Sequence, residues 1–201
     1  MLNVLSGELP ADGGSVRLAG EDVTTLPTHV IARKGMVRTF QNIRLFSGLS
    51  VRENVLAAGT GQTTDADLDL ILGRFGLSSV WNIPAGQLAY GMQRKVEIAR
   101  AVIRQPTVLL LDEPAAGMNE SESEILLGMI SSVRDELGCS VVVIDHDLRL
   151  ILRLCQRIQV LNEGRTIVVG SPDEVARDVR VIEAYMGREH APNTASRGEP
   201  N

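Results

Sequence analysis

The chain carries the stretch Val108-Leu109-Leu110-Leu111-Asp112-Glu113-Pro114, in which four apolar residues precede two acidic ones. A second apolar run, Ser140 to Asp145, also ends in an acid, and the segment from Ser121 to Leu137 between the two runs has helical periodicity. Continuous apolar strands joined by a helix predict a buried parallel pair with a right-handed crossover. The sequence therefore predicts an α/β fold with a mostly parallel core sheet. The apolar spacing of the connecting helix predicts which of its residues face inward. They are Ile125, Leu126, Met129, Ile130, Val133 and Leu137.

Further elements are predicted on both sides of this core. Alternation over Ser15 to Ala19 predicts part of a small antiparallel patch, Met36 to Phe40 reads as a strand, and a hairpin is expected around Asn162-Glu163-Gly164. Helices are expected at Thr28 to Lys34, Ser50 to Ala58, Ala66 to Phe75 and Gln93 to Arg104, with a capping box formed by Ser50 and Glu53. In the last of these helices, the charged residues are expected opposite an apolar face of Val96, Ala99 and Ile103.

Length and composition limit the classes of protein that fit. The 201 residues suit one domain, and the net charge of -5 does not favour non-specific binding to nucleic acid, so no nucleic-acid partner is predicted. No apolar run reaches the roughly 20 residues that span a bilayer, and the first residues lack the basic flank and cleavage site of a secretory signal. The two cysteines have no metal-type spacing, which predicts reduced, buried thiols. We expect the chain in the cytoplasm, with any membrane role exerted through a partner.

The acids that follow the first apolar run are the strongest candidates for chemistry. Ligands of open α/β sheets bind at the carboxyl ends of the strands, so Asp112 is placed to hold the Mg²⁺ of a nucleoside triphosphate. Glu113 beside it can act as general base for an attacking water, a role that contributes typically about 10²–10⁴-fold in rate. Two adjacent acids alone are more often solvated surface, but the buried strand that precedes them favours the functional interpretation.

Three other sequence features can be explained either by an ordinary structural role or by a functional one. The segment Leu88-Ala89-Tyr90-Gly91-Met92 leads into a helix, where free N–H groups and the helix dipole make an anion site, although an ordinary helix-entry turn has the same composition. His146, after the second apolar run, can sense or polarise a γ-phosphate, whereas a lone histidine is more often structural. Gln41, after the strand ending in Phe40, can orient a water or a metal ligand, but by itself carries little information.

The order and spacing of these groups resemble an ABC-type ATPase. The resemblance identifies Gln41 as the Q-loop glutamine, Asp112 as the Walker B aspartate, Glu113 as the catalytic glutamate and His146 as the switch histidine. It makes Leu88 to Met92 the signature segment and Ala115-Ala116-Gly117-Met118-Asn119 the D-loop. ATP and Mg²⁺ are the implied cofactors, with Glu113 and His146 catalytic, Asp112 and Gln41 at the metal, and nucleotide contacts from Gln41, Leu88, Ala89, Tyr90, Gly91, Met92 and Asn119.

The resemblance also implies the architecture. It is that of a P-loop NTPase-like ABC cassette over residues 1–187, with a partial antiparallel β subdomain and a helical signature subdomain at about residues 55–105. The polar stretch 188–201, rich in Pro and Gly, is expected to be a disordered tail.

Four segments narrow the resemblance to the ATP-binding subunits of branched-chain amino-acid importers. They are Arg38-Thr39-Phe40-Gln41-Asn42-Ile43-Arg44-Leu45-Phe46, Glu97-Ile98-Ala99-Arg100-Ala101, Pro114-Ala115-Ala116-Gly117-Met118-Asn119 and Val181-Ile182-Glu183-Ala184-Tyr185-Met186-Gly187. Such a subunit lies peripherally on the cytoplasmic face of the inner or plasma membrane. Its implied partners are integral membrane permease subunits, a second ATP-binding subunit of the same or another kind, and indirectly a substrate-binding protein.

Several alternatives stay open beside this one. Urea and short-amide importers share much of the pattern, and another amino-acid importer or a non-catalytic fragment of such a subunit would fit as well. A soluble ABC ATPase that works on ribosomes or DNA usually carries two cassettes or a long coiled-coil insertion, and neither is recognised in this sequence.

The sequence departs from the family pattern at its start. The phosphate cradle Gly-x-x-x-x-Gly-Lys-[Ser/Thr] is not found, and Met1 to Gly7 resembles the helix that directly follows it. We therefore expect the N-terminal strands and the P-loop to be missing, and the 201 residues alone neither to bind ATP tightly nor to fold stably. Smaller departures are Ala89 for the usual serine, Met92 for the frequent glutamine, and a short segment between Val55 and Leu88.

Overall fold

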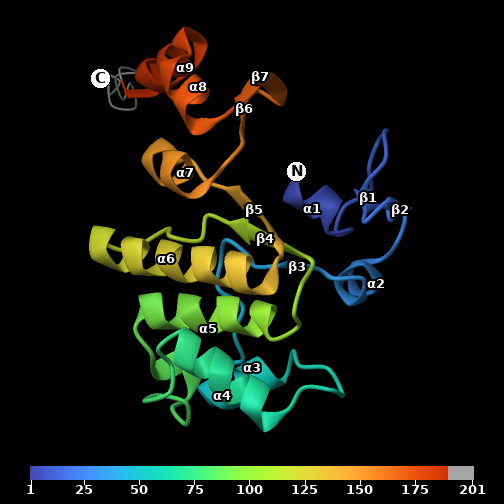
Figure 1. The fold of residues 1–201 in the computed structure, drawn as a ribbon, viewed down its shortest axis with the longest axis vertical. Coiled ribbons are helices and arrows are strands. Elements are labelled where there is room, and N and C mark those ends of the chain that lie inside the picture. The colour runs from blue at the N-terminus through green and yellow to red at the C-terminus, as the bar shows by residue number, and fades with distance from the viewer. Residues whose placement is uncertain (190–201) are drawn as a thin grey trace, which may run out of the picture. The chain divides into compact units, whose positions relative to one another are not determined.

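A computed structural model describes residues 1–189, and Figure 1 shows the course of their helices and strands. The chain divides into two compact units, of which the first is Met1–His146 and the second starts at Asp147. The last helix, α9, is Val179–Glu189, so the expected tail at 188–201 lies almost entirely outside the described residues. The two units are described separately below.

A parallel sheet of three strands forms the centre of the first unit. Its strands are β3 (Met36–Arg38), β4 (Val108–Asp112) and β5 (Ser140–Ile144), in the order β3-β4-β5. Both pairs are parallel, which confirms the predicted parallel arrangement of the two apolar runs. Strand β4 is buried as predicted, whereas β5 is only half-buried.

Helix α6 (Glu120–Leu137) connects β4 to β5. It begins with a capping box, in which Asn119 accepts from the Glu122 N–H and the Glu122 carboxylate accepts from the Asn119 N–H. It ends at Gly138, whose left-handed φ of 62° suits glycine. The prediction for Ile125 was wrong, because this side chain is 50% exposed, and the buried face comprises Leu126, Leu127, Ile130 and Val133.

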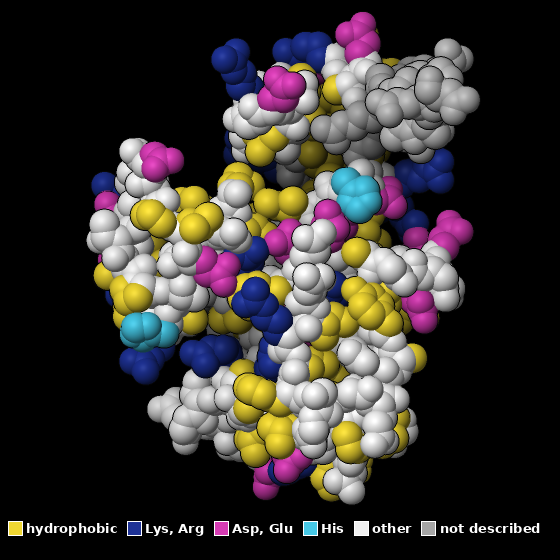
Figure 2. All heavy atoms as spheres, turned by 180° about the vertical axis from the view of Figure 1, so that it is seen from behind, with side chains coloured by type: hydrophobic (Ala, Val, Ile, Leu, Met, Phe, Trp, Pro, Cys, Tyr) yellow, Lys and Arg dark blue, Asp and Glu magenta, His cyan; other side chains and the backbone are white. Residues whose placement is uncertain are grey.

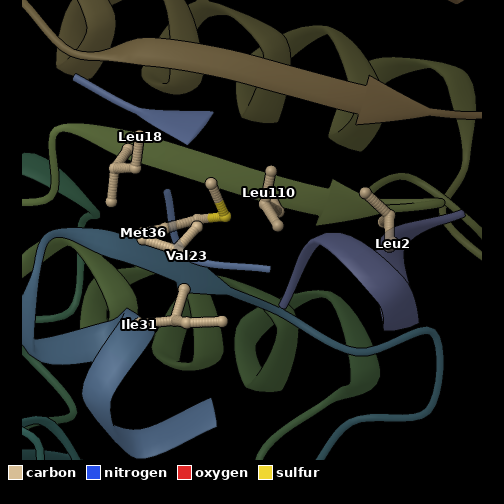
Figure 3. Packing of buried hydrophobic residues seen from close by; sticks show 6 residues of the cluster. All are labelled: Leu2, Leu18, Val23, Ile31, Met36 and Leu110. Carbon is tan, nitrogen blue, oxygen red and sulfur yellow. The ribbon is translucent and has the colours of Figure 1, made fainter. Parts of the chain in front are cut away.

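Short N-terminal elements cover one side of the sheet. They are α1 (Leu2–Leu5), the antiparallel strands β1 (Arg17–Leu18) and β2 (Glu21–Asp22), and α2 (Thr28–Arg33). The antiparallel patch is confirmed, although its strands are only two residues long. Figure 3 shows the buried cluster that joins these elements to β3 and β4, made of Leu2, Leu18, Val23, Ile31, Met36 and Leu110.

Three α-helices and a short 3₁₀ turn lie between β3 and β4. They are α3 (Val51–Leu56), α4 (Asp65–Arg74), η1 (Ala85–Gln87) and α5 (Tyr90–Val102), and the three α-helices pack on one another. The capping box of Ser50 and Glu53 at α3 is confirmed. Helix α5 begins at Tyr90 and not at the predicted Gln93, so the second half of the signature segment is helical.

The second unit contains α7 (Leu148–Leu154), β6 (Ile158–Asn162), β7 (Arg165–Gly170), α8 (Pro172–Arg177) and α9. Strands β6 and β7 form the predicted antiparallel hairpin, with an irregularity between Val160 and Leu161. Helix α8 packs against α7, β7 and α9. Among the described residues, none of the helices combines the length and apolar character that crossing a membrane requires.

Candidate active site

Glu113 lies at the centre of the candidate site, directly after the last residue of β4. Its φ of 44° is left-handed, a conformation that costs a non-glycine residue roughly 1–2 kcal/mol and that tends to occur at functional sites. Its N–H donates to the carbonyl of Ile144 at the end of β5, at 2.8 Å, which holds the turn against the neighbouring strand. The backbone thus presents the Glu113 carboxylate at the carboxyl edge of the sheet.

Both oxygens of this carboxylate have partners from the neighbouring strands. The Gln41 side-chain nitrogen, from the loop after β3, donates to Glu113 Oε2 at 3.1 Å. His146 Nδ1, from the loop after β5, lies 3.3 Å from Glu113 Oε1. The structure therefore brings together three of the residues that the sequence singled out, each from the end of a different strand.

The surroundings of His146 favour one assignment of its proton. Its Nδ1 also lies 3.6 Å from Asp145 Oδ1, so this nitrogen faces two carboxylates and is suited to carry the N–H. The His146 side chain is 73% exposed, whereas that of Glu113 is 24% exposed. Solvent can therefore reach the imidazole, whereas the carboxylate is shielded over most of its surface.

Asp112, the last residue of β4, has a basic partner that the sequence analysis did not assign to the site. Arg38 Nη2 donates to Asp112 Oδ2 at 2.8 Å, and the arginine side chain is 9% exposed. Its Nη1 donates to Glu8 Oε2 at 2.9 Å and to Asn3 Oδ1 at 2.6 Å, so the guanidinium joins α1 and its following turn to the end of β4. The register of the sheet, in which Arg38 pairs with Leu110, is the signal that would have placed it near Asp112.

The donor set fits a magnesium ion that arrives with a nucleotide. Among residues 1–189, no group of three or more histidine, cysteine or acidic side chains is placed to hold a metal ion. Mg²⁺ is usually bound through one or two carboxylates while substrate phosphates and waters fill its other positions. The single carboxylate of Asp112, with the Gln41 amide close to its neighbour Glu113, is a set of that kind.

The signature segment, residues 88–92, forms a second group of predicted site residues. It enters α5 at Tyr90, and the Gln93 side chain closes the entry by donating to the Leu88 carbonyl at 2.8 Å. A Cβ on Gly91 would lie 3.3 Å from Glu122 Oε1, and a Cβ on Gly117 would lie 3.2 Å from the Tyr90 ring. The signature segment therefore packs against the D-loop and the start of α6.

The other predicted members of this group are Ala89, Met92 and Asn119. Ala89 is exposed and precedes the helix as its N-cap, and Met92 is half-buried in the first turn. Asn119 is exposed, but its side-chain oxygen is occupied as the cap of α6.

Arg94 and Glu97, which the sequence analysis placed opposite the apolar face of α5, are buried on that side as well. Their side chains are 0% and 2% exposed and form an ion pair of 2.7 Å. Almost the whole circumference of α5 is buried, because α3, α4 and α6 all pack against it. Burial raises the pKa of Glu97, an effect that Arg94 and the backbone N–H groups of Phe40 and Arg44 oppose.

Comparison with known proteins identifies the family of the chain. The family described as "ABC transporter" matches residues 1–116, and that described as "Branched-chain amino acid ATP-binding cassette transporter" matches residues 165–191. The high-affinity branched-chain amino acid transport ATP-binding protein BraF of Pseudomonas aeruginosa is 37% identical over 210 residues, covering 93% of this chain and 81% of its own length. The corresponding LivG protein of Escherichia coli is 36% identical over 207 residues, with the same two shares.

A relative with another cargo and a solved structure complete the comparison. The lipopolysaccharide export system ATP-binding protein LptB of Haemophilus influenzae is 31% identical over 189 residues, covering 91% of this chain and 78% of its own length. The ADP conformation of an ATP-binding cassette of an ABC transporter superposes with a TM-score of 0.82 at 26% identity, over 92% of this chain and 82% of that one. The predicted family and cassette fold are confirmed, and the chain belongs to the ATP-binding subunits of ABC transporters, which hydrolyse ATP.

Proposed function

We propose that the complete ATP-binding subunit, to which this chain contributes Glu113 as the general base, powers the import of branched-chain amino acids by hydrolysing ATP. The observation that carries this proposal is the Glu113 carboxylate held between the Gln41 amide and the His146 imidazole. A general base must lie within hydrogen-bond reach of the water that it activates, and a carboxylate at the carboxyl edge of the sheet is placed where nucleotides bind.

In the proposed reaction, a water oxygen attacks the γ-phosphorus while Glu113 takes its proton. The bond between the γ-phosphorus and the bridging oxygen breaks, and ADP leaves with that oxygen. Gln41 and His146 position the carboxylate and the water. Asp112, with Gln41, would hold Mg²⁺, which when bound neutralises charge on the phosphates.

The nucleotide contacts of the signature segment belong to a pair of subunits in this proposal. Tyr90, Gly91 and Met92 form the first turn of α5, and Leu88 and Ala89 precede it. The N-terminus of a helix favours a phosphate. Asn119 lies at the start of α6, beside this segment. Two ATP-binding subunits would sandwich ATP, with the signature segment of one subunit closing on the nucleotide of the other.

Exposed hydrophobic side chains support membrane permease subunits as partners. Phe46, Leu56, Leu70 and Trp81, in and around α3 and α4, are between 42% and 60% exposed. Figure 2 shows hydrophobic side chains among polar ones over its lower part, where α3 and α4 lie in Figure 1. Exposed apolar surface of this kind commonly marks a protein contact. We place the subunit on the cytoplasmic face of the membrane, served indirectly by a substrate-binding protein.

The proposal that the transported solute is a branched-chain amino acid rests on the names of the relatives. BraF and LivG are named for branched-chain amino acid transport, and the match at residues 165–191 carries the same description. Urea and short amides are the second candidate cargo, because the resemblance described in the sequence analysis extends to their importers. Leucine-stimulated ATPase activity of the transporter in liposomes supports the first cargo, and stimulation by urea or acetamide but not by leucine would replace it.

The base is tested by Glu113→Gln in the assembled transporter. This change keeps the shape of the side chain and removes its basicity, so ATPase activity should fall by about 10²-fold or more while ATP binding stays close to that of the parent. Glu163→Gln, in the turn between β6 and β7, is the matched control and should keep parental turnover. Turnover retained by Glu113→Gln would remove Glu113 from the role of base.

A further inference from the structure

Arg94 and Glu97 form the most completely buried ion pair among the described residues. They lie three residues apart in α5, in the second turn of the helix that begins in the signature segment. Neither residue contacts Glu113 through any described hydrogen bond, and neither belongs to the reaction proposed above. Their role is therefore inferred from the groups with which their side chains form hydrogen bonds.

The pair holds the backbone of the segment that follows β3. Arg94 Nη1 donates to the Phe40 carbonyl and Arg94 Nη2 to the Gln41 carbonyl, each at 2.7 Å. Glu97 Oε1 accepts from the N–H groups of Phe40 and Arg44, each at 3.4 Å. Four backbone groups of residues 40–44 are thus fixed to α5 by two side chains. One of these groups belongs to Gln41, whose side chain reaches Glu113.

Stability alone is a poor explanation for this arrangement. Removing two charges from water is costly, and replacing a buried ion pair by apolar side chains of similar volume is often neutral or stabilising. Arg94 Nε adds to the cost, because it is buried without a hydrogen-bond partner among the described residues. What an apolar pair could not supply is a set of directional hydrogen bonds to a loop.

A third contact extends the same connection to the signature segment. Arg94 Nη2 lies 3.2 Å from the Tyr90 hydroxyl, and the Tyr90 ring packs against Gly117 of the D-loop. The guanidinium therefore touches, directly or through one ring, three segments on which the proposed reaction depends.

We propose that Arg94 and Glu97 are positioning residues that fix residues 40–44 to α5, so that the orientation of Gln41 toward Glu113 follows the position of the signature helix. The catalytic part of this inference rests on the proposed function, in which Glu113 is the base. The attachment itself does not, and it can be measured separately.

The decisive variant replaces both members of the pair, as Arg94→Met with Glu97→Met, in the assembled transporter. Apolar side chains of similar length keep the core filled, so the thermal midpoint should stay within about 4 °C of the parent. We expect kcat to fall about tenfold or more, with KM for ATP changed less than about threefold, because small misplacements of catalytic groups act on the chemical step. Amide hydrogen exchange of residues 40–44 should become about tenfold faster, while exchange in β4 stays unchanged.

A matched control makes the same chemical change at an exposed pair. Arg134→Met with Asp135→Met, in α6, removes an ion pair whose side chains are 26% and 65% exposed, and should leave kcat and the exchange of residues 40–44 unchanged. If the buried double variant does not fold, Glu97→Gln provides the same two measurements with almost no change in volume.

Each outcome decides a separate question. Parental kcat and parental exchange of residues 40–44 in a folded variant would overturn the proposal and leave the pair a purely structural one. Faster exchange with parental kcat would overturn the catalytic part. If the parent transporter itself hydrolyses no ATP, the proposed function fails, and the exchange measurement still decides whether the pair fixes the loop.

Discussion

Replacing Arg38 by methionine should destabilise the first unit by roughly 2–3 kcal/mol. The guanidinium donates to two carboxylates, Glu8 and Asp112, and to the side-chain oxygens of Asn3 and Ser6. Hydrogen bonds to charged groups contribute roughly 1.5–3 kcal/mol each when buried. That range must be lowered here, because the Glu8 and Asp112 side chains are 30% and 22% exposed and can be rehydrated in the variant. Methionine keeps the apolar stem, so little packing is lost.

The change can be measured by thermal and urea unfolding of the purified subunit, prepared with the N-terminal strands and P-loop that the family pattern includes and followed by circular dichroism. For a protein of this size, a loss of 2–3 kcal/mol corresponds to a fall in the thermal midpoint of about 4–12 °C. The urea midpoint should fall without a change in the slope, because the surface exposed on unfolding stays the same.

Lys34→Met is the matched control for Arg38→Met. It breaks the ion pair of Lys34 with Glu21, whose side chains are 32% and 61% exposed, and should cost less than about 1 kcal/mol. If the two variants lose the same stability, then burial does not make the Arg38 contacts any stronger, and the reasoning is refuted.

Three further predictions concern a turn, the core and a helix cap. Gly117→Ala should cost about 1–2 kcal/mol in thermal unfolding, because φ is 76° and the new methyl would lie 3.2 Å from the Tyr90 ring; unchanged stability would mean that the D-loop relaxes freely. Leu110→Ala, at a site 1% exposed, should lose about 2–5 kcal/mol in urea unfolding, and a loss below this range would show that the core collapses into the space. Hydrogen bonds from Thr64 lower the pKa of Asp67, so the stability that the ionised carboxylate contributes is present above about pH 4 and is lost as pH falls through the lowered pKa. In Thr64→Ala, a carboxyl titration followed by NMR should show the Asp67 pKa moved up toward its ordinary value; an unmoved pKa would contradict the role of the cap.

The sequence was most informative where a local pattern decides the structure. The apolar runs of β4 and β5 and the periodic helix between them predicted the parallel pair, because such strands are stable only inside a layered α/β fold. The capping box at Ser50 and Glu53 located the start of α3, because both of its hydrogen bonds lie within four residues of the chain.

It was least informative where burial depends on distant segments. The charges of α5 were expected opposite its apolar face, and the spacing did not reveal that Arg94 and Glu97 are buried there, because α5 is enclosed by helices from both directions along the chain. Ile125 was expected inward and is half exposed, whereas Leu127, two residues further along α6, is buried. Periodicity fixes the side of a helix to within one residue and does not say how much of its circumference other elements cover.

In the candidate site, too, the residues that follow a local pattern were predicted, and the residue that depends on distant contacts was not. Gln41, Glu113 and His146 each follow a strand, so the topology of the sheet brings them together as the strand-end rule predicts. Arg38 was missed, because its importance depends on the register between β3 and β4 and on contacts with α1. The roles of these residues stay predictions until the variants are measured.

The left-handed backbone of Glu113 has a consequence for laboratory evolution. Glycine and asparagine adopt a φ near 44° more readily than glutamate, and relief of this strain is worth roughly 1 kcal/mol, partly offset for glycine by the greater freedom of the unfolded chain. A selection for heat tolerance alone would therefore favour residues at position 113 that cannot accept a proton from water. Libraries screened for thermal stability should be screened for ATP turnover in the same round, because substitutions at position 113 that raise the stability are expected to lower the turnover.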